Sequence, residues 1–414
     1  MNDDSLPPKP HEHTLQPLTR GELFLLLLLA GVQFTHIMDF MILMPLGPSL
    51  MRIFEIEPKE FGLLVSSYNF SAGITGFIGA FFLDRFDRKR ALLVSYCGFT
   101  LGTLACAFSP NYATLLISRS LAGVFGGVIG ALIMSIVGDA IPVSKRGRAM
   151  GLVMASFSLA SVFGVPFGIV LANKYDWHAP FLFVGGMAAI IGVAAAMYLP
   201  SMRGHLQSRE SRPTPYHVLE RVITNPSQMR ALLLVMLLML GQFVIVPFIS
   251  PSLVANVGFR EDQLPWMYLV GGGLTMFTSP LVGRLCDKFG RHLIFTIFGI
   301  AVLIPAVAIT QLGPTPILWV LVISSFFFVA SNGRFVPAWA LITSTVRPEA
   351  RGSFLSLTSS LQSISGGVAS FIASLIVIQG ADGRLLNFEI VGYLSAIIGV
   401  LAIFIGRGLK TIDA

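Results

Sequence analysis

The sequence predicts an all-α integral membrane protein with twelve transmembrane helices in two pseudo-symmetric six-helix bundles. Composition is the first observation behind this prediction: of 414 residues, 54% are hydrophobic and only 12% are charged. A soluble domain has about 25% charged residues. The mean hydropathy of +0.77 points the same way, because a globular core cannot bury this much apolar surface and a lipid bilayer can.

Apolar runs are the second observation. A helix needs about 20 mostly apolar residues to cross a bilayer, and the chain holds twelve such runs, six on each side of a polar stretch. The runs lie near 22–48, 61–83, 91–108, 113–137, 149–172, 180–199, 231–255, 264–285, 293–311, 316–340, 352–378 and 389–406. They divide the chain into an N-terminal tail (1–21), a first bundle (22–199), a central loop (200–230), a second bundle (231–406) and a C-terminal tail (407–414).

An internal repeat is the third observation. Asp84 in LDRFDRK recurs as Asp287 in LCDKFGR, 203 residues later. Two further landmarks keep nearly the same spacing: Pro48 recurs as Pro251, and Arg146 as Arg351. A duplication of six helices explains this constant offset, and transporters use such repeats to place a site between two halves.

The basic residues predict the orientation in the membrane. With the N-terminus inside, the inside segments hold 21 of the 28 Lys and Arg residues and the outside loops hold 5, while Arg119 and Arg334 lie within runs. Cytoplasmic loops are enriched in Lys and Arg, so we expect both termini on the cytoplasmic side of the cytoplasmic (inner) membrane. Short basic clusters between apolar runs also favour a lipid bilayer, and not nucleic acid, as the partner.

A nine-residue motif connects this chain to a known family. Residues 283–291, GRLCDKFGR, match the pattern G-x-L-x-D-[RK]-x-G-[RK]. The chain thereby resembles the major facilitator superfamily, in which this pattern joins helices 2 and 3. Its defining positions here are Gly283, Asp287, Gly290 and Arg291. The first-half copy, AFFLDRFDRK at 80–89, has Ala80 and Asp87 where the pattern has glycine.

The resemblance implies the major facilitator fold and a set of contacts that close its cytoplasmic side. Asp84 would face the start of helix 11 (Gly352–Ser356), and Asp287 the start of helix 5. A carboxylate at a helix N-terminus is stabilised by up to about 2 kcal/mol when partly buried. Arg88 would pair with Asp139 at the cytoplasmic end of helix 4. The alternative is a basic loop that only sets the topology.

Two further matches resemble the export-type drug:proton antiporter branch of the superfamily. Arg119-Ser-Leu-Ala-Gly123 is similar to the R-x-x-x-G pattern of helix 4 in that branch. Helix 5 matches the signature of the branch in part, and it carries a small residue at every fourth position, which lets another helix approach closely. The residues that we assign to helix packing are Gly123, Gly127, Gly164, Pro166 and Gly168.

Three polar residues interrupt the first apolar run. Gln33, His36 and Asp39 are spaced by three, which places them along one helix face. Asp39 lies about midway between the charged residues that bracket the run, so it is expected near the bilayer centre. An Asp there costs roughly 2.5–3.5 kcal/mol, and such residues usually face a cavity and a partner.

We expect Asp39 and His36 to take part in proton coupling, with Arg119 as the counter-charge. Burial and a neighbouring cation act in opposite directions on the affinity of a carboxylate for protons, so Asp39 could exchange a proton as a cavity alternates. The repeat places Gln242 at the matching position of the second half, so the scaffold does not require the acid. The alternative is a permanent Asp39–Arg119 ion pair that holds helices 1 and 4 together.

A second charge within the spans occurs in helix 10. Arg334, in SNGRFVPAWA, lies well inside the predicted span and has no acid in its own helix. It suggests a polar or anionic substrate group, or a carboxylate from another helix. Snorkelling to the inner surface is the alternative. The residues that we assign to a substrate cavity are Gln33, Gln242, Asn332 and Arg334.

The expected function is secondary active transport: proton-coupled efflux of a small organic compound or drug, by a monomer, through alternating access. One alternative is uptake or export of a specific metabolite such as a sugar, siderophore or amino acid, and another is a transporter-like receptor. The sequence has no G-x-S-x-G, H-E-x-x-H or Walker-type motif. We therefore expect no enzyme activity, no cofactor and no metal site.

Overall fold

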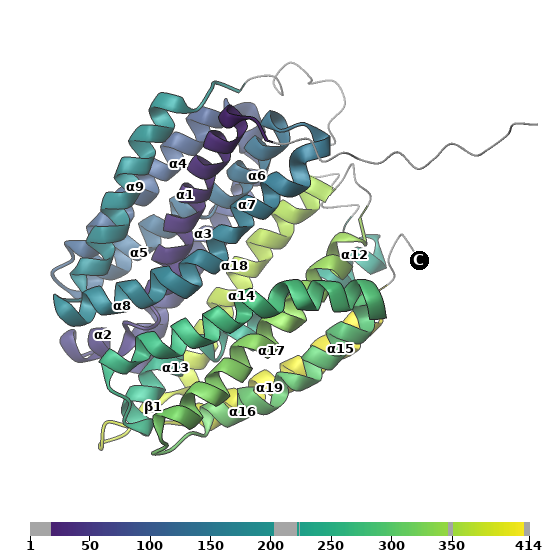
Figure 1. Cartoon of the computed structure of the whole chain (residues 1–414). Coiled ribbons are helices and arrows are strands. Elements are labelled where there is room, and N and C mark those ends of the chain that lie inside the picture. The colour runs from purple at the N-terminus through teal and green to yellow at the C-terminus, as the bar shows by residue number, and fades with distance from the viewer. Residues whose placement is uncertain (1–17, 203–221, 223, 347–350, 410–414) are drawn as a thin grey trace, which may run out of the picture.

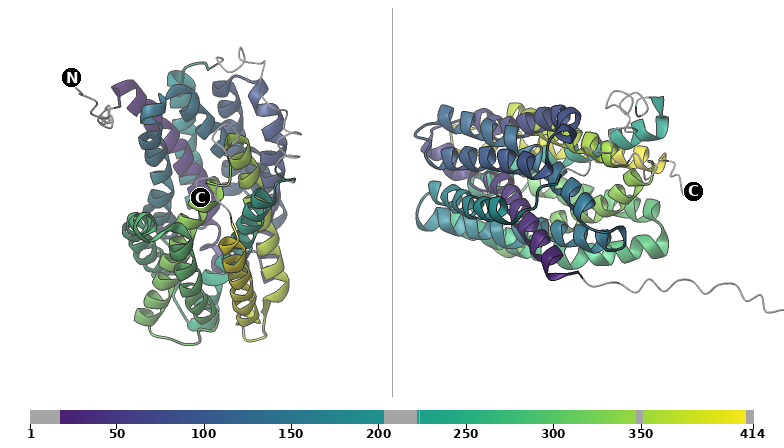
Figure 2. Two further views of the ribbon diagram at one scale, coloured as in Figure 1. Left: turned by 90° about the vertical axis from the view of Figure 1, so that its right-hand side faces the viewer. Right: turned by 90° about the horizontal axis from the view of Figure 1, so that it is seen from above.

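A computed structural model describes residues 18–202, 222, 224–346 and 351–409, without the side chains of residues 84, 143 and 351–353. The chain forms two helical halves, which run from purple to teal and from green to yellow in Figure 1. Figure 2 shows the helices of each half side by side along a common direction. The predicted pair of six-helix bundles is confirmed.

The first half contains the first six predicted spans, some of them in two or three pieces. Its elements are α1 (Arg20–Ile42), α2 (Gly47–Ile53), α3 (Pro58–Phe82), η1 (Leu83–Arg85), α4 (Arg88–Ala107), α5 (Tyr112–Gly126), α6 (Ile129–Ala140), η2 (Val143–Lys145), α7 (Arg146–Leu159), η3 (Ala160–Gly164), α8 (Val165–Lys174) and α9 (His178–Tyr198). The pieces of one span follow each other with breaks of a few residues at most.

The second half repeats this arrangement. Its helices are α12 (Pro226–Phe243), α13 (Val246–Ser252), η4 (Leu253–Val257), η5 (Glu261–Gln263), α14 (Leu264–Phe289), α15 (Arg291–Ala301), α16 (Leu303–Thr310), α17 (Ile317–Thr343), α18 (Arg351–Ile376) and α19 (Phe388–Arg407). A two-stranded antiparallel hairpin, β1 (Ile378–Gln379) and β2 (Leu385–Leu386), departs from the all-helical prediction in the loop before α19.

Local sequence signals explain where several helices begin. Thr19 caps α1 and forms a capping box with Glu22, which satisfies amide groups that would otherwise have no partner. Asn225 accepts hydrogen bonds from the first amides of α12, and Pro226 occupies the first turn, where its missing N–H costs nothing. Helix α12 therefore begins five residues before the predicted start of its span.

Several breaks within spans coincide with proline, although the break between α5 and α6 at Gly127 and Val128 does not. The π-helical turn η3 lies directly before Pro166 in the first turn of α8. In the second half, α13 contains Pro251 and leads into the π-helical turn η4. Proline lacks an N–H and clashes with the preceding turn, so the backbone widens there while its other amides stay bonded.

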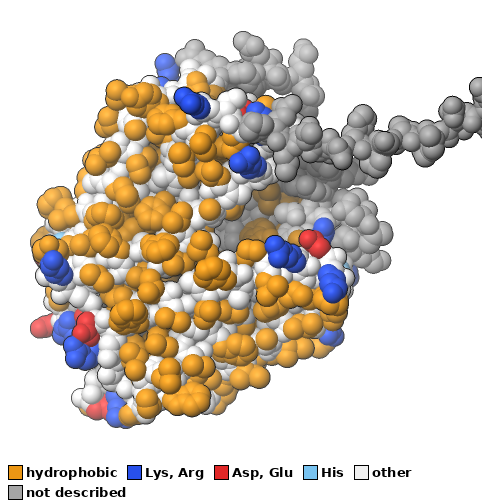
Figure 3. Space-filling view, viewed as in Figure 1, with side chains coloured by type: hydrophobic (Ala, Val, Ile, Leu, Met, Phe, Trp, Pro, Cys, Tyr) orange, Lys and Arg blue, Asp and Glu red, His pale blue; other side chains and the backbone are white. Residues whose placement is uncertain are grey.

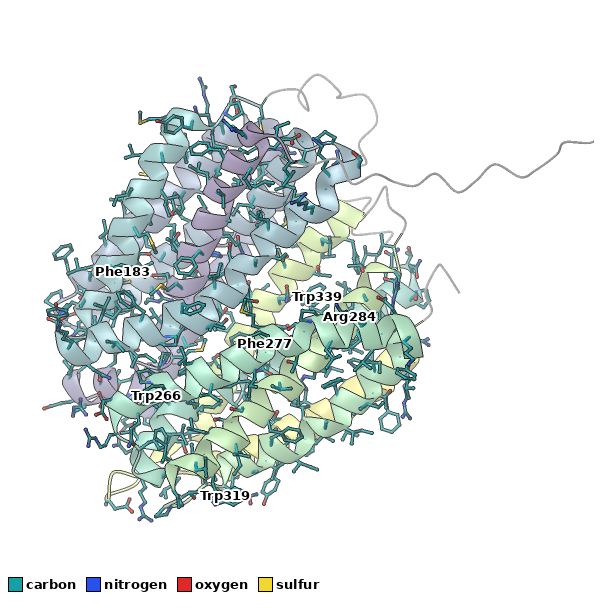
Figure 4. The ribbon with its side chains drawn as sticks, in the orientation of Figure 1. Phe183, Trp266, Phe277, Arg284, Trp319 and Trp339 are labelled. Carbon is teal, nitrogen blue, oxygen red and sulfur yellow. The ribbon has the colours of Figure 1, made fainter. Side chains whose placement is uncertain are left out.

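The surface matches a protein embedded in lipid. Eleven helical segments of the described chain are long and apolar enough to span a membrane; α14 is long enough, with 26 residues, but falls outside this set. Figure 3 shows a face covered mainly by hydrophobic side chains, with Lys and Arg near its borders. Exposed Trp266 and Trp319 lie toward the lower end of Figure 4, as in the aromatic belts of membrane proteins.

The two ends of the molecule differ in charge. We call the end where α1 starts and α9 finishes the basic end, and the other the opposite end. The basic end carries Arg85, Arg88, Lys89, Arg90, Lys145, Arg146, Arg148, Arg284, Lys288 and Arg291. The opposite end carries Arg52, Lys59, Lys174, Arg260 and Arg384.

The hydrophobic cores show how the halves meet. One core at the opposite end contains residues from both halves, among them Phe61 and Phe248, whose ring centroids are 5.9 Å apart. At the basic end the halves have separate cores, one around Leu92 and the other around Leu341. Figure 3 shows the surface hollowed between the halves on the side of the basic end. The halves therefore share a core at the opposite end and keep α3 against α18 as far as Gly76 and Ser360, while their cores are separate toward the basic end.

Polar contacts add to the seam at the opposite end. The carboxylate of Glu261, in the short helix η5 before α14, accepts hydrogen bonds from Ser49 Oγ at 2.5 Å and from Arg52 Nη1 at 2.7 Å. Its backbone oxygen accepts a hydrogen bond from Asn173 Nδ2 at 3.0 Å. One residue of the second half thus holds the ends of two spans of the first half. Nothing in the sequence marked Glu261 among the acids of the loops.

We expect Glu261→Gln to loosen the opposite end. An exposed ion pair contributes up to about 1 kcal/mol, which corresponds to a roughly fivefold shift between two conformations. Spin labels on Lys59 and Arg384, in a Cys97→Ser background that removes the exposed native thiol, would report the distance between the halves by electron double resonance. The distance distribution should gain a longer component.

Asp262→Asn is the matched control, because the ion pair of Asp262 with Arg260 stays within the second half. Its distance distribution should equal that of the parent. Identical distributions for Glu261→Gln and the parent would show that Glu261 does not hold the seam.

Candidate functional site

Asp39 is buried inside the first half, where three helices meet. Its side chain is 0% exposed. Its Oδ2 accepts a hydrogen bond from Arg119 Nη1 of α5 at 2.9 Å, and its Oδ1 accepts one from Thr103 Oγ1 of α4 at 3.0 Å. The structure therefore joins the predicted acid and counter-charge directly. Thr103 was missed, because a threonine in a helix usually bonds to its own backbone.

Arg119 has further partners besides the carboxylate of Asp39. Its Nη1 also lies 3.3 Å from the backbone oxygen of Asp39, and its guanidinium carbon is 4.6 Å from the ring centroid of Tyr68. The residue is only 1% exposed. Removing one partner of such a buried pair typically costs 3–5 kcal/mol, because the remaining charge stays in a low-dielectric interior. The pair is closed in this conformation.

Gln33 and His36 lie on α1 between Asp39 and the basic end. Both side chains are partly buried. Gln33 Oε1 and His36 Nδ1 are buried atoms without a hydrogen-bond partner among the described residues. The ring of His36 contacts that of Phe99 edge-on, with centroids 5.5 Å apart, and no described hydrogen bond joins it to Asp39. Of the three polar residues on this face of α1, Asp39 is therefore paired with Arg119. Within the described chain, Gln33 and His36 each keep an unpaired polar atom.

The predicted cavity residues of the second half divide into two sites. Arg334 Nη2 on α17 donates a hydrogen bond to Gln242 Oε1 on α12 at 3.2 Å. Asn332 instead accepts a hydrogen bond from Ser279 Oγ on α14, also at 3.2 Å. Arg334 is 4% exposed, so it does not snorkel to the surface. Gln242 and Arg334 form one site between α12 and α17, and Asn332 forms the other with α14.

The loop after α3 makes the expected pair and an unexpected one. Arg88 Nε lies 3.3 Å from Asp139 Oδ2, so this predicted contact is confirmed. Asp87 caps α4 through Lys89 N at 2.9 Å, and it also accepts hydrogen bonds from the backbone N–H of Met202, at 3.2 Å, and from the hydroxyl of Ser201. Asp87 therefore fastens the residues after α9 to this loop.

Backbone conformation explains why Asp87 can replace glycine. The matching residue of the second half, Gly290, has φ +88° and ψ 145°, which is accessible to glycine but strained for other residues. Asp87 has φ −56° and ψ 126°, which any residue can adopt. The first-half loop thus turns without glycine, and the side chain of Asp87 supplies the cap.

The predicted contacts of Asp84 and Asp287 with helix starts have different outcomes. The side chains of Asp84 and of residues 351–353 lie outside the described residues. Asp287 is exposed at the basic end, and no described hydrogen bond or ion pair joins it to α7. Space is open around Gly283 and Gly290. In this conformation the contact of Asp287 with the start of helix 5 is absent from the described residues, which agrees with halves that part at this end.

The glycines assigned to packing lie at close helix contacts. Gly123 of α5 and Gly127 at its end face the backbone of α3, and a Cβ at either would strike a backbone oxygen. Gly164 faces Met38 of α1, and Gly168 of α8 faces Ile42. Close approach of α5 and α8 to their neighbours positions the helices that carry Arg119 and Asp39.

Comparison with known proteins places the chain in a family. The family model of the Major Facilitator Superfamily matches residues 29–370 and 231–410. The chain belongs to this superfamily. It is a multi-pass membrane transporter. The members of the superfamily that are similar to this chain are transporters rather than enzymes.

Three of the curated relatives come from bacteria. It is 25% identical over 347 residues to the MFS-type transporter YceJ of Bacillus subtilis (84% of this chain, 87% of the relative). It is 24% identical over 356 residues to a protein of Helicobacter pylori named "Probable sugar efflux transporter" (86% and 87%). A chloramphenicol efflux pump of Mycobacterium tuberculosis is 28% identical over 253 residues (60% of each chain).

Solved structures share the fold. A bacterial homolog of the human lysosomal transporter Spinster, in an inward-facing and occupied conformation, aligns with a TM-score of 0.77 at 14% identity (94% of this chain, 97% of that chain). A D-xylose–proton symporter aligns with a TM-score of 0.74 at 16% identity (94% and 99%).

Charge removal should test the Asp39–Arg119 pair. Arg119→Gln leaves a buried carboxylate without its cation, and we expect a loss of roughly 3–5 kcal/mol in stability. Combining it with Asp39→Asn removes both charges and should recover most of that loss. Thermal unfolding in detergent measures the stability of the two single variants and of the double variant. The difference between the double variant and the sum of the single variants gives the interaction free energy of the pair.

Arg384→Gln is the control for this experiment, because Arg384 is 56% exposed and pairs only loosely with Asp382. Its midpoint should change little. Additive effects of the two buried substitutions would contradict a stabilising ion pair.

Proposed function

We propose that this protein exports a small organic molecule across the cytoplasmic membrane in exchange for protons, with Asp39 as the proton-carrying group. The burial of Asp39 among three spans, next to a cation, is the observation on which the proposal rests. A carboxylate inside a membrane span is expensive and usually functional. The names of the relatives, a chloramphenicol efflux pump and a sugar efflux transporter, favour export of an organic solute.

The basic end is the cytoplasmic side in this proposal, since Lys and Arg are enriched in cytoplasmic loops. The described conformation, with parted halves at that end, would then accept substrate from the cytoplasm. Glu261 and the shared core would close the outer side. Rocking of the halves opens the outer side and exposes the site there, as in other transporters built from repeats. The protein works as a monomer in this scheme.

Proton exchange at Asp39 needs the closed pair to open. In the inward-open state the carboxylate is charged and bound to Arg119. In the outward-open state it takes a proton, and Arg119 keeps the backbone oxygen of Asp39 and the ring of Tyr68 as partners. Gln33 and His36 line the way from Asp39 to the cytoplasm and carry unpartnered polar atoms, so they are suited to relay the proton through water.

The energy of one proton is sufficient for useful export. One elementary charge that crosses 100 mV supplies about 2.3 kcal/mol. That free energy corresponds to a concentration ratio of roughly fiftyfold.

A static role for Asp39 is the second candidate, because the pair is sealed from solvent at 0% and 1% side-chain exposure. In that case the Asp39–Arg119 pair only holds α1 against α5. This candidate predicts that Asp39 does not affect the response to a pH gradient.

Transport by purified protein in liposomes distinguishes these functions. We expect an imposed pH gradient to drive chloramphenicol movement by the parent at least tenfold faster than by Asp39→Asn, while exchange without a gradient persists in both. A pH-sensitive dye inside the liposomes should record proton movement only when chloramphenicol is present.

Asp176→Asn is the matched control, since Asp176 is an exposed acid (58%) at the opposite end; it should behave as the parent. Undiminished gradient-driven transport by Asp39→Asn would remove Asp39 from the coupling mechanism. Equal rates with and without a gradient in the parent would remove proton coupling itself.

A further inference from the structure

The two halves use the same helices to hold an arginine, but with different chemistry. In the first half, the first helix supplies Asp39 and the fourth supplies Arg119. In the second half, the first helix supplies Gln242, 203 residues after Asp39, and the fourth supplies Arg334. The two arginines are 215 residues apart, and not 203. The second half therefore repeats the contact between its first and fourth helices but not the exact position of the arginine. One pair is neutral in total, and the other carries a positive charge.

No carboxylate of the described residues balances Arg334. The salt bridges of the described chain do not include it, and its polar contact at hydrogen-bond distance is the uncharged Gln242. In sequence, every acid of the second half lies in a loop or at the end of a span: Glu261, Asp262, Asp287, Glu349, Asp382, Glu389 and Asp413. The one acid near the middle of a span, Asp39, is bound to Arg119.

The guanidinium of Arg334 also has unused hydrogen-bonding capacity. Within the described chain its Nε is a buried donor without a partner, and so is the hydroxyl of Ser331, which lies one turn earlier on α17. Both residues are at least 96% buried. Unpaired polar groups and unpaired charge are unfavourable in a low-dielectric interior. A bound anion would relieve both at once.

The site adjoins the seam between the halves and has aromatic neighbours. The guanidinium carbon of Arg334 is 5.6 Å from the ring centroid of Phe335. Phe243, next to Gln242, packs against Phe40 of the first half at a centroid distance of 5.8 Å. A group bound at Gln242 is therefore close to the surface along which the halves move.

We propose that Arg334 and Gln242 bind the carboxylate of organic acids, which are then among the molecules that the protein transports. The guanidinium offers a planar set of donors that matches a carboxylate, and the amide of Gln242 can swing to donate its N–H₂ to the same group. The inference rests on the proposed transport function but not on its coupling to protons.

Gln242→Glu tests the uncompensated charge without any ligand. It places a carboxylate where the amide oxygen now lies 3.2 Å from Arg334, and so copies the arrangement of the first half. We expect the midpoint of thermal unfolding to rise by about 2 °C or more. A fall in the midpoint would contradict the premise that the charge of Arg334 lacks a balancing partner.

Ligand binding tests the substrate class. Purified protein is titrated, by thermal shift, with acetate, hexanoate, 2-naphthoate and glucuronate, and with the four corresponding amides. We expect at least one carboxylate to bind the parent, its amide to bind at least tenfold more weakly, and Arg334→Gln and Gln242→Glu each to weaken the carboxylate at least tenfold. Arg407→Gln, the same change at an exposed arginine of the second half, should bind as the parent does.

The outcomes separate this proposal from proton coupling. If none of the four carboxylates binds better than its amide, or if Arg334→Gln binds them as the parent does, the organic-acid site is refuted whatever the behaviour of Asp39→Asn. If the carboxylates bind through Arg334 and the pH gradient drives no transport, only the proton coupling fails.

Discussion

The ion pair between Asp39 and Arg119 is the constraint around which the first half is built. A charge in a bilayer-embedded bundle needs a partner within hydrogen-bonding distance, and this requirement fixes the relative positions of α1, α4 and α5. Glycines then become necessary at the contacts between helices: Gly123 and Gly127 bring α5 against α3, and Gly168 brings α8 against the end of α1. Because these helices pack so closely around the buried pair, the pair can separate only if whole helices move.

Duplication with local divergence explains the differences between the halves. Asp39 and Gln242 occupy matching positions, as do Asp87 and Gly290. In each case one half carries a carboxylate that makes specific hydrogen bonds, and the other carries a neutral residue. Asp87 bonds to Ser201 and Met202, where the chain leaves the first half, so this loop is tied to the central segment. Polar specialisation is thus concentrated in the first half.

The sequence was sufficient for the fold and for two of the ion pairs, Asp39–Arg119 and Arg88–Asp139. Apolar runs predict spans reliably, because the bilayer imposes a length and composition on them. Arg119 could be matched with Asp39 because so few charges lie within the spans, and Arg88 with Asp139 because the resemblance to the superfamily implies that pair. Contacts among uncharged or loop residues gave no such signal. Thr103 could equally have bonded to its own helix, and Glu261 resembled every other acid in a loop until the two halves were placed together.

The conformation could not be predicted for a related reason. Several arrangements of the same two bundles satisfy the same apolar pattern, and only interactions across the seam select one of them. Here the seam contains a shared core and the bonds of Glu261 at the opposite end, while Asp287 stays exposed at the basic end. Closure of the basic end would have to supply new packing and polar bonds in place of those that open at the opposite end.

The charges of the proposed sites determine how a membrane potential would act on the cycle. With Asp39 charged and an organic acid on Arg334, the two arginines are balanced and the interior is neutral. After release of the acid outside and protonation of Asp39, the interior carries two positive charges. A membrane that is negative inside pulls this empty, protonated state back toward the cytoplasm, where Asp39 releases its proton to the cytoplasm and forms the pair with Arg119 again. Exchange of one monoanion for one proton moves two charges, so 100 mV supplies about 4.6 kcal/mol per cycle. The potential therefore acts most strongly on the return step, which has no substrate to stabilise it.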